Sequence, residues 1–184
     1  MLYCQSEQGP AIIYFYFDFH DAEKQLHGKL IRSLITQLSA QSKHTPEPLN
    51  TIYSRCQEGQ QQPTIADLVL TLRHMLGDFC ETFIIVDALD ECTEREGLLG
   101  MLKEIVDWKL EKLHILTTSR REKDIEESLT PLTTGQICIQ SALVNADIQL
   151  HIRHRLQNDQ KLKRWPLVVQ GEIEKSLMDG AHGM

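Results

Sequence analysis

Apolar residues follow two kinds of spacing along the chain. Two short runs, Ala11–Phe17 and Thr82–Val86, are apolar or aromatic at nearly every position, and a third, His114–Thr118, contains Ile115 and Leu116 followed by two threonines. Runs of this length predict buried strands. A weaker run, Gln136–Gln140, predicts a fourth strand. Between the runs, apolar residues recur every three or four positions, which predicts amphipathic helices with one buried stripe.

Polar residues mark where several of these helices begin. Thr64 with Asp67, and Thr93 with Glu96, have the spacing of a capping box, in which each side chain bonds the backbone of the other residue. The segment Ser42–Pro63 is rich in proline, glycine and glutamine and predicts a loop-rich insertion. The predicted helices cover residues 22–41, 64–79, 93–108, 146–158 and 167–179.

The order of these elements predicts an α/β fold. Strands that are apolar on both faces and separated by helices indicate a parallel sheet covered by helices on both faces. The length of 184 residues fits one domain. We therefore predict one domain over residues 1–184, with an irregular lead-in at 1–10, an α/β core at 11–143 and a helical C-terminal part at 144–184.

Charge and cysteine usage narrow the possible partners and the compartment. The chain has 19 basic and 26 acidic residues and a net charge of −7, which argues against binding nucleic acid or an anionic membrane through the field of the whole domain. No apolar run approaches the ~18 residues that suggest a membrane span, and the first residues do not resemble a signal peptide. The cysteines are scattered and predict unpaired thiols in a reducing, cytoplasmic environment.

The candidate chemistry lies where two of the predicted strands end. Ligands of parallel α/β sheets bind outside the carboxyl ends of the strands. The strand Thr82–Val86 is followed by Asp87-Ala-Leu-Asp-Glu-Cys92, and the strand ending at Thr118 is followed by Ser119-Arg120-Arg121. Four apolar residues followed by an aspartate form the Walker B pattern. Asp87 is therefore the predicted metal ligand, holding Mg²⁺ through water while the metal bridges nucleotide phosphates.

The neighbouring charged residues suggest catalytic roles. Asp90 and Glu91 are predicted to complete the metal shell or to orient and deprotonate an attacking water. Arg120 is predicted to donate to the γ-phosphate and stabilise the charge of the transferring group. A single aspartate after a strand is more often a loop or capping residue. The acidic and arginine motifs occurring together favour the nucleotide-binding interpretation.

The segments Phe83–Cys92 and Ile115–Arg120 together resemble the NACHT domain of STAND P-loop NTPases. The likeness is closest to the nephrocystin-type N-terminal module of large fungal NLR-like and ankyrin-repeat proteins. Tyr14–Phe19 is similar to the strand that follows the P-loop helix in that family, and Leu177–Met184 to the end of its NACHT region. The resemblance thus covers nearly the whole chain.

The resemblance implies a role for each candidate residue. Asp87 corresponds to the Walker B aspartate, Asp90 and Glu91 to its acidic extension, and Arg120 to the sensor on the following strand. The family binds Mg²⁺ with ATP or GTP, hydrolyses the nucleotide slowly and uses it as a switch for oligomerisation and signalling. Protein partners or self-association are therefore implied, together with a P-loop segment and C-terminal repeat domains in family members.

One part of the family pattern is missing from the sequence. The P-loop, G-x-x-x-x-G-K-[ST], does not occur in the 184 residues. The one Gly-Lys pair, Gly28-Lys29, has Glu23 in place of the first glycine and Leu30 in place of Ser or Thr. Without this loop the backbone cradle for phosphates is lost. We therefore expect an incomplete sheet with an exposed edge, poor solubility, weak or absent nucleotide binding and no hydrolysis by this chain alone.

Two other functions stay open at this stage. The first is a nucleotide-independent interaction or scaffold module, or a decayed remnant of a NACHT domain. The second is an unrelated Mg²⁺-dependent phosphoester enzyme that uses Asp87, Asp90 and Glu91. The second ranks last because the sequence offers no second carboxylate cluster for a two-metal site.

Overall fold

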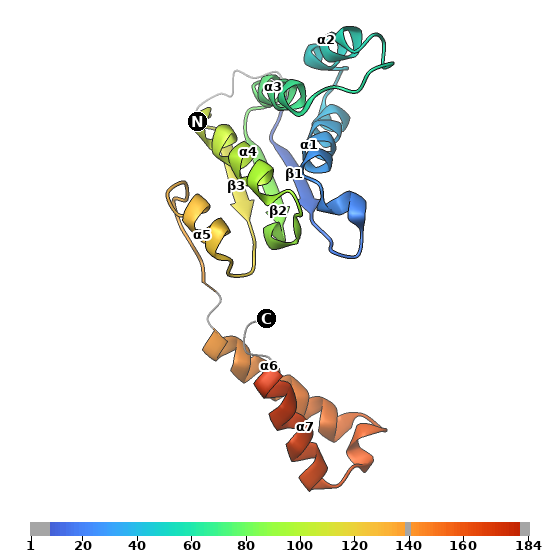
Figure 1. Ribbon diagram of the computed structural model, residues 1–184, viewed down its shortest axis with the longest axis vertical. Helices are drawn as coiled ribbons and strands as arrows, with labels where there is room; N and C mark the ends of the chain where they lie inside the picture. The colour runs from blue at the N-terminus through green and yellow to red at the C-terminus, as the bar shows by residue number, and fades with distance from the viewer. Residues whose placement is uncertain (1–7, 139–140, 181–184) are drawn as a thin grey trace. The chain divides into compact units, whose positions relative to one another are not determined.

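The computed structural model describes residues 8–138 and 141–180, which form two compact units divided between Thr133 and Thr134. The first unit contains a three-stranded sheet in the order β1-β2-β3 (Figure 1). Both neighbouring pairs of strands are parallel. The strands are β1 (Ala11–Tyr16), β2 (Thr82–Asp87) and β3 (Leu113–Thr117).

Helices connect the strands and make up the second unit. In the first unit they are η1 (Ala22–Gln25), α1 (His27–Gln41), α2 (Glu47–Arg55), α3 (Ile65–Leu76), η2 (Leu89–Glu91), α4 (Arg95–Asp107) and α5 (Lys123–Leu129). In the second unit they are α6 (Ser141–Asn158), η3 (Leu162–Arg164) and α7 (Leu167–Gly180). The predicted α/β class, with a parallel sheet flanked by helices and a helical C-terminal segment, is confirmed.

The core lies between one face of the sheet and the helices. Ile13 pairs in register with Ile84, and Ile84 with Ile115, so these three side chains share a face. Ile13 and Ile84 are buried, and Ile115 packs partly buried against the same cluster. The helices contribute further fully buried side chains to this core, among them Leu30, Leu34 and Leu38 of α1, Leu72 and Met75 of α3, and Leu98 and Ile105 of α4.

The opposite face of the sheet carries apolar side chains that are exposed. Buried and exposed positions alternate along β1, because successive side chains of a strand point to opposite faces. The exposed set on this face comprises Ile12, Tyr14, Tyr16, Phe83 and Leu116. The apolar character of both faces was predicted from the sequence, but within the described residues only one face is covered.

The helix starts agree with the sequence in one case and differ in another. The Thr64–Asp67 capping box of α3 is confirmed, with Asp67 N–H donating to Thr64 Oγ1 at 3.2 Å. That hydroxyl donates in turn to the carboxylate, and this bond is the main cause that lowers the pKa of Asp67. The prediction of a Thr93–Glu96 capping box is wrong, because Thr93 donates its N–H and its hydroxyl to the carbonyl of Gln25.

Three segments differ from the sequence expectation. The region predicted as a loop contains α2, with Pro48 in its first turn, where a missing N–H costs nothing. Residues 136–138 form no strand and Ile137 is 93% exposed, while residues 139–140 lie outside the described part of the chain. Gly28 lies in the first turn of α1, as expected for a helix rather than a phosphate loop.

The second unit is a helical hairpin. Glu174 of α7 accepts hydrogen bonds from Gln149 and Arg153 of α6, at 2.7 and 2.9 Å. Asp159 follows α6 and accepts from the N–H groups of residues 161 and 162, which lowers its carboxyl pKa.

None of the helices in the described ranges combines the length and the apolar character needed to cross a bilayer.

Candidate functional site

The loop after β2 turns back sharply into the core. Asp87 is the last residue of the strand, and Ala88 adopts a left-handed conformation with φ 58° and ψ 53°. This turn directs Leu89, which is 0% exposed, into the core beneath the loop. Leu89 N–H also donates to the carbonyl of Thr118 at 3.0 Å. The acidic loop is therefore fixed both by packing and by the strand end beside it.

Thr118 links the two strand ends through its side chain. Its hydroxyl oxygen accepts from Ala88 N–H at 3.0 Å and its hydroxyl proton goes to Asp87 Oδ1 in a short hydrogen bond. The other carboxylate oxygen of Asp87 makes no hydrogen bond within the described residues. One oxygen of Asp87 is thus oriented by the protein, and the second is open to a cation or a water.

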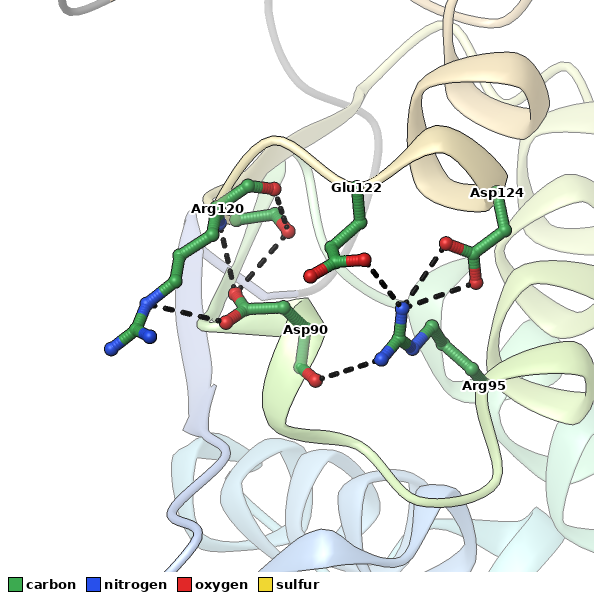
Figure 2. Close-up of polar contacts among 6 residues, drawn as sticks. Asp90, Arg95, Arg120, Glu122 and Asp124 are labelled. Atoms are coloured by element: carbon green, nitrogen blue, oxygen red, sulfur yellow. Dashed lines mark hydrogen bonds and ion pairs between the residues drawn. The ribbon is translucent and has the colours of Figure 1, made fainter. Parts of the chain in front are cut away.

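Asp90 holds the loop that follows β3. Its carboxylate is only 10% exposed and accepts from Arg120 N–H at 2.9 Å and from Ser119 Oγ at 3.3 Å (Figure 2). Arg120 Nε lies 3.6 Å from the second carboxylate oxygen. A hydrogen bond from a backbone N–H to a carboxylate is charge-assisted and stronger than one between neutral groups. Asp90 therefore fixes the position of the Arg120 backbone.

The guanidinium of Arg120 is available at the surface. The side chain is 62% exposed, and its terminal nitrogens extend away from Asp90 in Figure 2. A guanidinium in this position can donate two parallel hydrogen bonds to an oxyanion. The predicted pairing of an acidic cluster with an arginine at one edge of the sheet is present in the structure.

Glu91 faces a different neighbour. Its Oε2 accepts from the backbone N–H of Phe19, in the loop after β1, at 2.9 Å. The carboxylates of Asp87 and Asp90 are therefore held by the residues that follow β3, and that of Glu91 by the loop after β1. Cys92 closes the loop as a buried thiol, and burial is the main cause that raises its pKa. A raised thiol pKa makes this cysteine a poor nucleophile at neutral pH.

Arg95 is a site residue that the sequence analysis missed. Its Nη1 lies 3.1 and 3.3 Å from the carboxylate oxygens of Asp124 and 3.5 Å from Glu122 (Figure 2). Its Nη2 donates to the carbonyl of Asp90 at 3.3 Å. Arg95 thereby joins the acidic loop, the start of α4 and the start of α5. An arginine at the start of a helix belongs to no sequence motif. Its contacts with Asp124 and with the acidic loop arise only from the fold.

The residues after β2 and β3 supply few ligands for a metal ion. Within residues 8–138 and 141–180, no group of three or more His, Cys, Asp or Glu side chains is placed to hold a metal ion. Asp87, with one unbonded oxygen, fits the role of a single protein ligand whose metal takes its other oxygens from water and phosphate.

A cavity of about 420 Å³ lies elsewhere, beside α2, with Leu49, Tyr53 and Pro63 in its lining.

The left-handed conformation of Ala88 gives a testable prediction. A side chain at positive φ is strained, and glycine is not. Ala88→Gly should leave the fold intact and raise the free energy of unfolding by up to about 1 kcal/mol. Ala88→Val should lower it by about 2 kcal/mol or more, because branching at Cβ increases the strain. Urea unfolding of both variants checks the order, and a Val variant as stable as the Gly variant would rule the strained turn out.

The fold and the edge together define an α/β protein with a parallel sheet, an acidic loop after the middle strand and an exposed arginine after the neighbouring strand. The chain belongs to the Nephrocystin 3, N-terminal family, whose model matches residues 2–120. The matched segment includes the three strands and every candidate residue from Asp87 to Arg120. No curated protein and no solved structure matches the chain.

Proposed function

We propose that this chain is part of a NACHT-type nucleotide-binding switch domain of the STAND class. The observation that carries the proposal is the pairing of β2 with β3, which brings Asp87 and Arg120 to one edge with Thr118 between them. A metal ligand and a phosphate-binding cation on adjacent strand ends are what a Mg²⁺–nucleotide site needs. Membership of the nephrocystin 3 N-terminal family supports the same assignment.

Each residue has a distinct part in this proposal. Asp87 is the Walker B residue and would hold Mg²⁺ through its unbonded oxygen, and the ion would neutralise phosphate charge. Arg120 is the sensor and donates to the terminal phosphate. Asp90 positions Arg120 through the backbone hydrogen bond at 2.9 Å. Glu91 uses one oxygen for Phe19 and offers the other to a water near the phosphates.

The proposed activity is that of a switch in a larger protein. The 184 residues contain no G-x-x-x-x-G-K-[ST] sequence, so this chain supplies the metal and sensor side chains but not the phosphate cradle. A P-loop segment, repeat domains such as ankyrin repeats and protein partners would complete the system in the cytoplasm. The resemblance of Phe83–Cys92 and Ile115–Arg120 to NACHT domains supports regulation of oligomerisation and signalling as the proposed output.

Titration with Mg-ATP and Mg-GTP tests the proposal. We expect weak binding, with a dissociation constant on the order of millimolar, because most phosphate contacts are missing. Asp87→Asn should weaken it further, since a neutral amide cannot hold the metal. Asp107→Asn is the matched control, because it removes the same charge from an exposed position at the far end of α4. Binding that Asp87→Asn and Asp107→Asn alter equally would overturn the assignment of Asp87.

A further inference from the structure

The segment 119–124, which leads from β3 into α5 and carries Arg120, is attached to the acidic loop at both of its ends. At the first end, Asp90 accepts from Arg120 N–H at 2.9 Å. At the second end, the carboxylate oxygens of Asp124 lie 3.1 and 3.3 Å from Nη1 of Arg95. Nη2 of Arg95 donates to the carbonyl of Asp90 at 3.3 Å. The contacts close a ring between the acidic loop and this segment, and Arg95 completes it (Figure 2).

Both arms of the Arg95 guanidinium are used in this ring. Nη1 faces carboxylates at the start of α5, with Glu122 at 3.5 Å in addition to Asp124, and Nη2 faces the backbone of the acidic loop. A guanidinium holds its nitrogens in a rigid plane, whereas lysine offers one ammonium group. The side chain is 30% exposed, so salt screens these contacts less than those of a fully exposed pair. The ring therefore requires an arginine rather than a positive charge alone.

The other cations of the segment do not replace Arg95. Arg121 lies 3.4 Å from Glu126, and Lys123 lies 3.8 Å from Glu127, so both pair with carboxylates of α5. Their side chains are 84% and 88% exposed and make no contact with the acidic loop in the described ranges. Among the residues that the structure describes, Arg95 alone bonds both the acidic loop and α5.

The start of α4, from which this guanidinium extends, is fixed independently of α5. Thr93 donates its N–H and its hydroxyl to the carbonyl of Gln25, at 3.0 and 3.2 Å. Glu94 Oε2 lies 2.6 Å from Nδ1 of His27, the first residue of α1. Gly97 lets this ring approach, because a Cβ there would lie 2.9 Å from its Cε1 atom. The guanidinium is therefore held on backbone that is anchored to the other side of the sheet unit.

We infer that Arg95 is a positioning residue for Arg120. It holds the segment 119–124 against the acidic loop, so the guanidinium of Arg120 stays at the edge where Asp87 ends β2. Arg95 touches neither metal nor phosphate in this role and acts through the backbone of the segment. The role rests on the proposed function, because Arg120 is the sensor of that proposal. Without Arg95, the hydrogen bond of Asp90 would hold the segment at one end only.

Amide hydrogen exchange of Arg120, measured by NMR in the nucleotide-free full chain, tests the inference. Arg95→Met keeps the apolar stem and removes both arms of the ring, so the Arg120 N–H should exchange at least about fivefold faster. Arg95→Lys should show nearly the same increase, because one ammonium group cannot span both partners. Arg55→Met is the matched control, since it removes an ion pair of 3.2 Å to Asp67 elsewhere. Unchanged exchange in Arg95→Met, or an equal increase in Arg55→Met, would overturn the inference.

A second variant keeps the test decisive if loss of Arg95 unfolds the chain. Glu122→Gln combined with Asp124→Asn leaves the arginine in place and neutralises its partners at two exposed positions. The Arg120 N–H should then exchange about threefold faster or more, because the end of the segment at α5 is released. Exchange at the parent rate in this double variant would also contradict the ring.

The response to Mn²⁺ separates positioning from general disruption. In Arg95→Met, broadening of the Asp87 amide by Mn²⁺ should persist, because Thr118 orients this carboxylate through a separate bond. Binding of Mg-ATP should weaken about threefold or more, because Arg120 no longer has a fixed place. Loss of both responses would show a collapsed edge and overturn the positioning role. A parent chain in which Mg-ATP leaves the Nε–H signal of Arg120 unmoved counts against the proposed function, whereas exchange without nucleotide decides on Arg95 by itself.

Discussion

Leu89→Ala should lower the free energy of unfolding by about 2–5 kcal/mol, the range found for buried leucines that leave a cavity. Leu89 is 0% exposed and lies between the metal-ligand candidate Asp87 and the loop anchor Asp90. Its removal takes away the apolar contact that holds the left-handed turn at Ala88 in place. Urea unfolding followed by circular dichroism measures the change.

The control for this prediction is the same substitution at a leucine on the surface. Leu70 lies on the outer side of α3 and is 45% exposed. Leu70→Ala should change the unfolding free energy by no more than about 0.5–1 kcal/mol, as surface substitutions usually do. If the two variants lose similar stability, packing of Leu89 is not what fixes the acidic loop.

Asp90→Ala should lower the free energy of unfolding by about 1–3 kcal/mol, because it removes the acceptor of the hydrogen bonds from the loop after β3. The carboxylate is 10% exposed and accepts from Arg120 N–H and Ser119 Oγ. Its loss also releases the loop that carries the sensor candidate. We therefore expect the amide hydrogen of Arg120 to exchange faster with solvent, as measured by NMR.

The isosteric variant separates the two functions of this carboxylate. Asp90→Asn keeps an oxygen that can accept from Arg120 N–H and removes only the charge. Because Arg120 is largely exposed, the ion pair contributes little, about 0–1 kcal/mol. Asp90→Asn should thus be the milder change. Equal losses for the Ala and Asn variants would show that the charge, and not the backbone hydrogen bond, stabilises the loop.

The strands and the acidic edge could be predicted from the sequence because their signals are local. An apolar run of strand length such as Thr82–Val86 predicts a buried strand from its own residues, and the aspartate after it is then expected at a strand end. The same reasoning predicted that Arg120 would stand at this edge after the next strand. Two neighbouring parallel strands then bring both residues together.

The contacts that set the site could not be predicted because they join distant segments. Thr118 bonds Asp87 and Ala88 across two strands, and Arg95 reaches Asp124 across two helices. The helix start at residue 95 shows the same limit. The spacing of a capping box was present at Thr93, but Gln25, far away in sequence, took its hydrogen bonds. Local spacing predicts which hydrogen bonds a side chain could form, and the tertiary structure determines which of them it forms.

The exposed face of the sheet shows a further limit of sequence patterns. Continuous apolar runs indicate that both faces are fit for burial, but they do not say what covers them. One face meets α1 and α4 within the chain, and the other presents Tyr14 and Leu116 to solvent.

The central claim is that Asp87 is the metal ligand of this edge, and paramagnetic NMR tests it most directly. Mn²⁺ in place of Mg²⁺, added to the ¹⁵N-labelled chain, should broaden the amide signals of residues 87–91 and 118–120 before all others. Excess Mg²⁺ should reverse the effect, and Asp87→Asn should abolish it while Asp107→Asn does not. Broadening that is centred elsewhere, is absent from this edge or persists in Asp87→Asn would contradict the account.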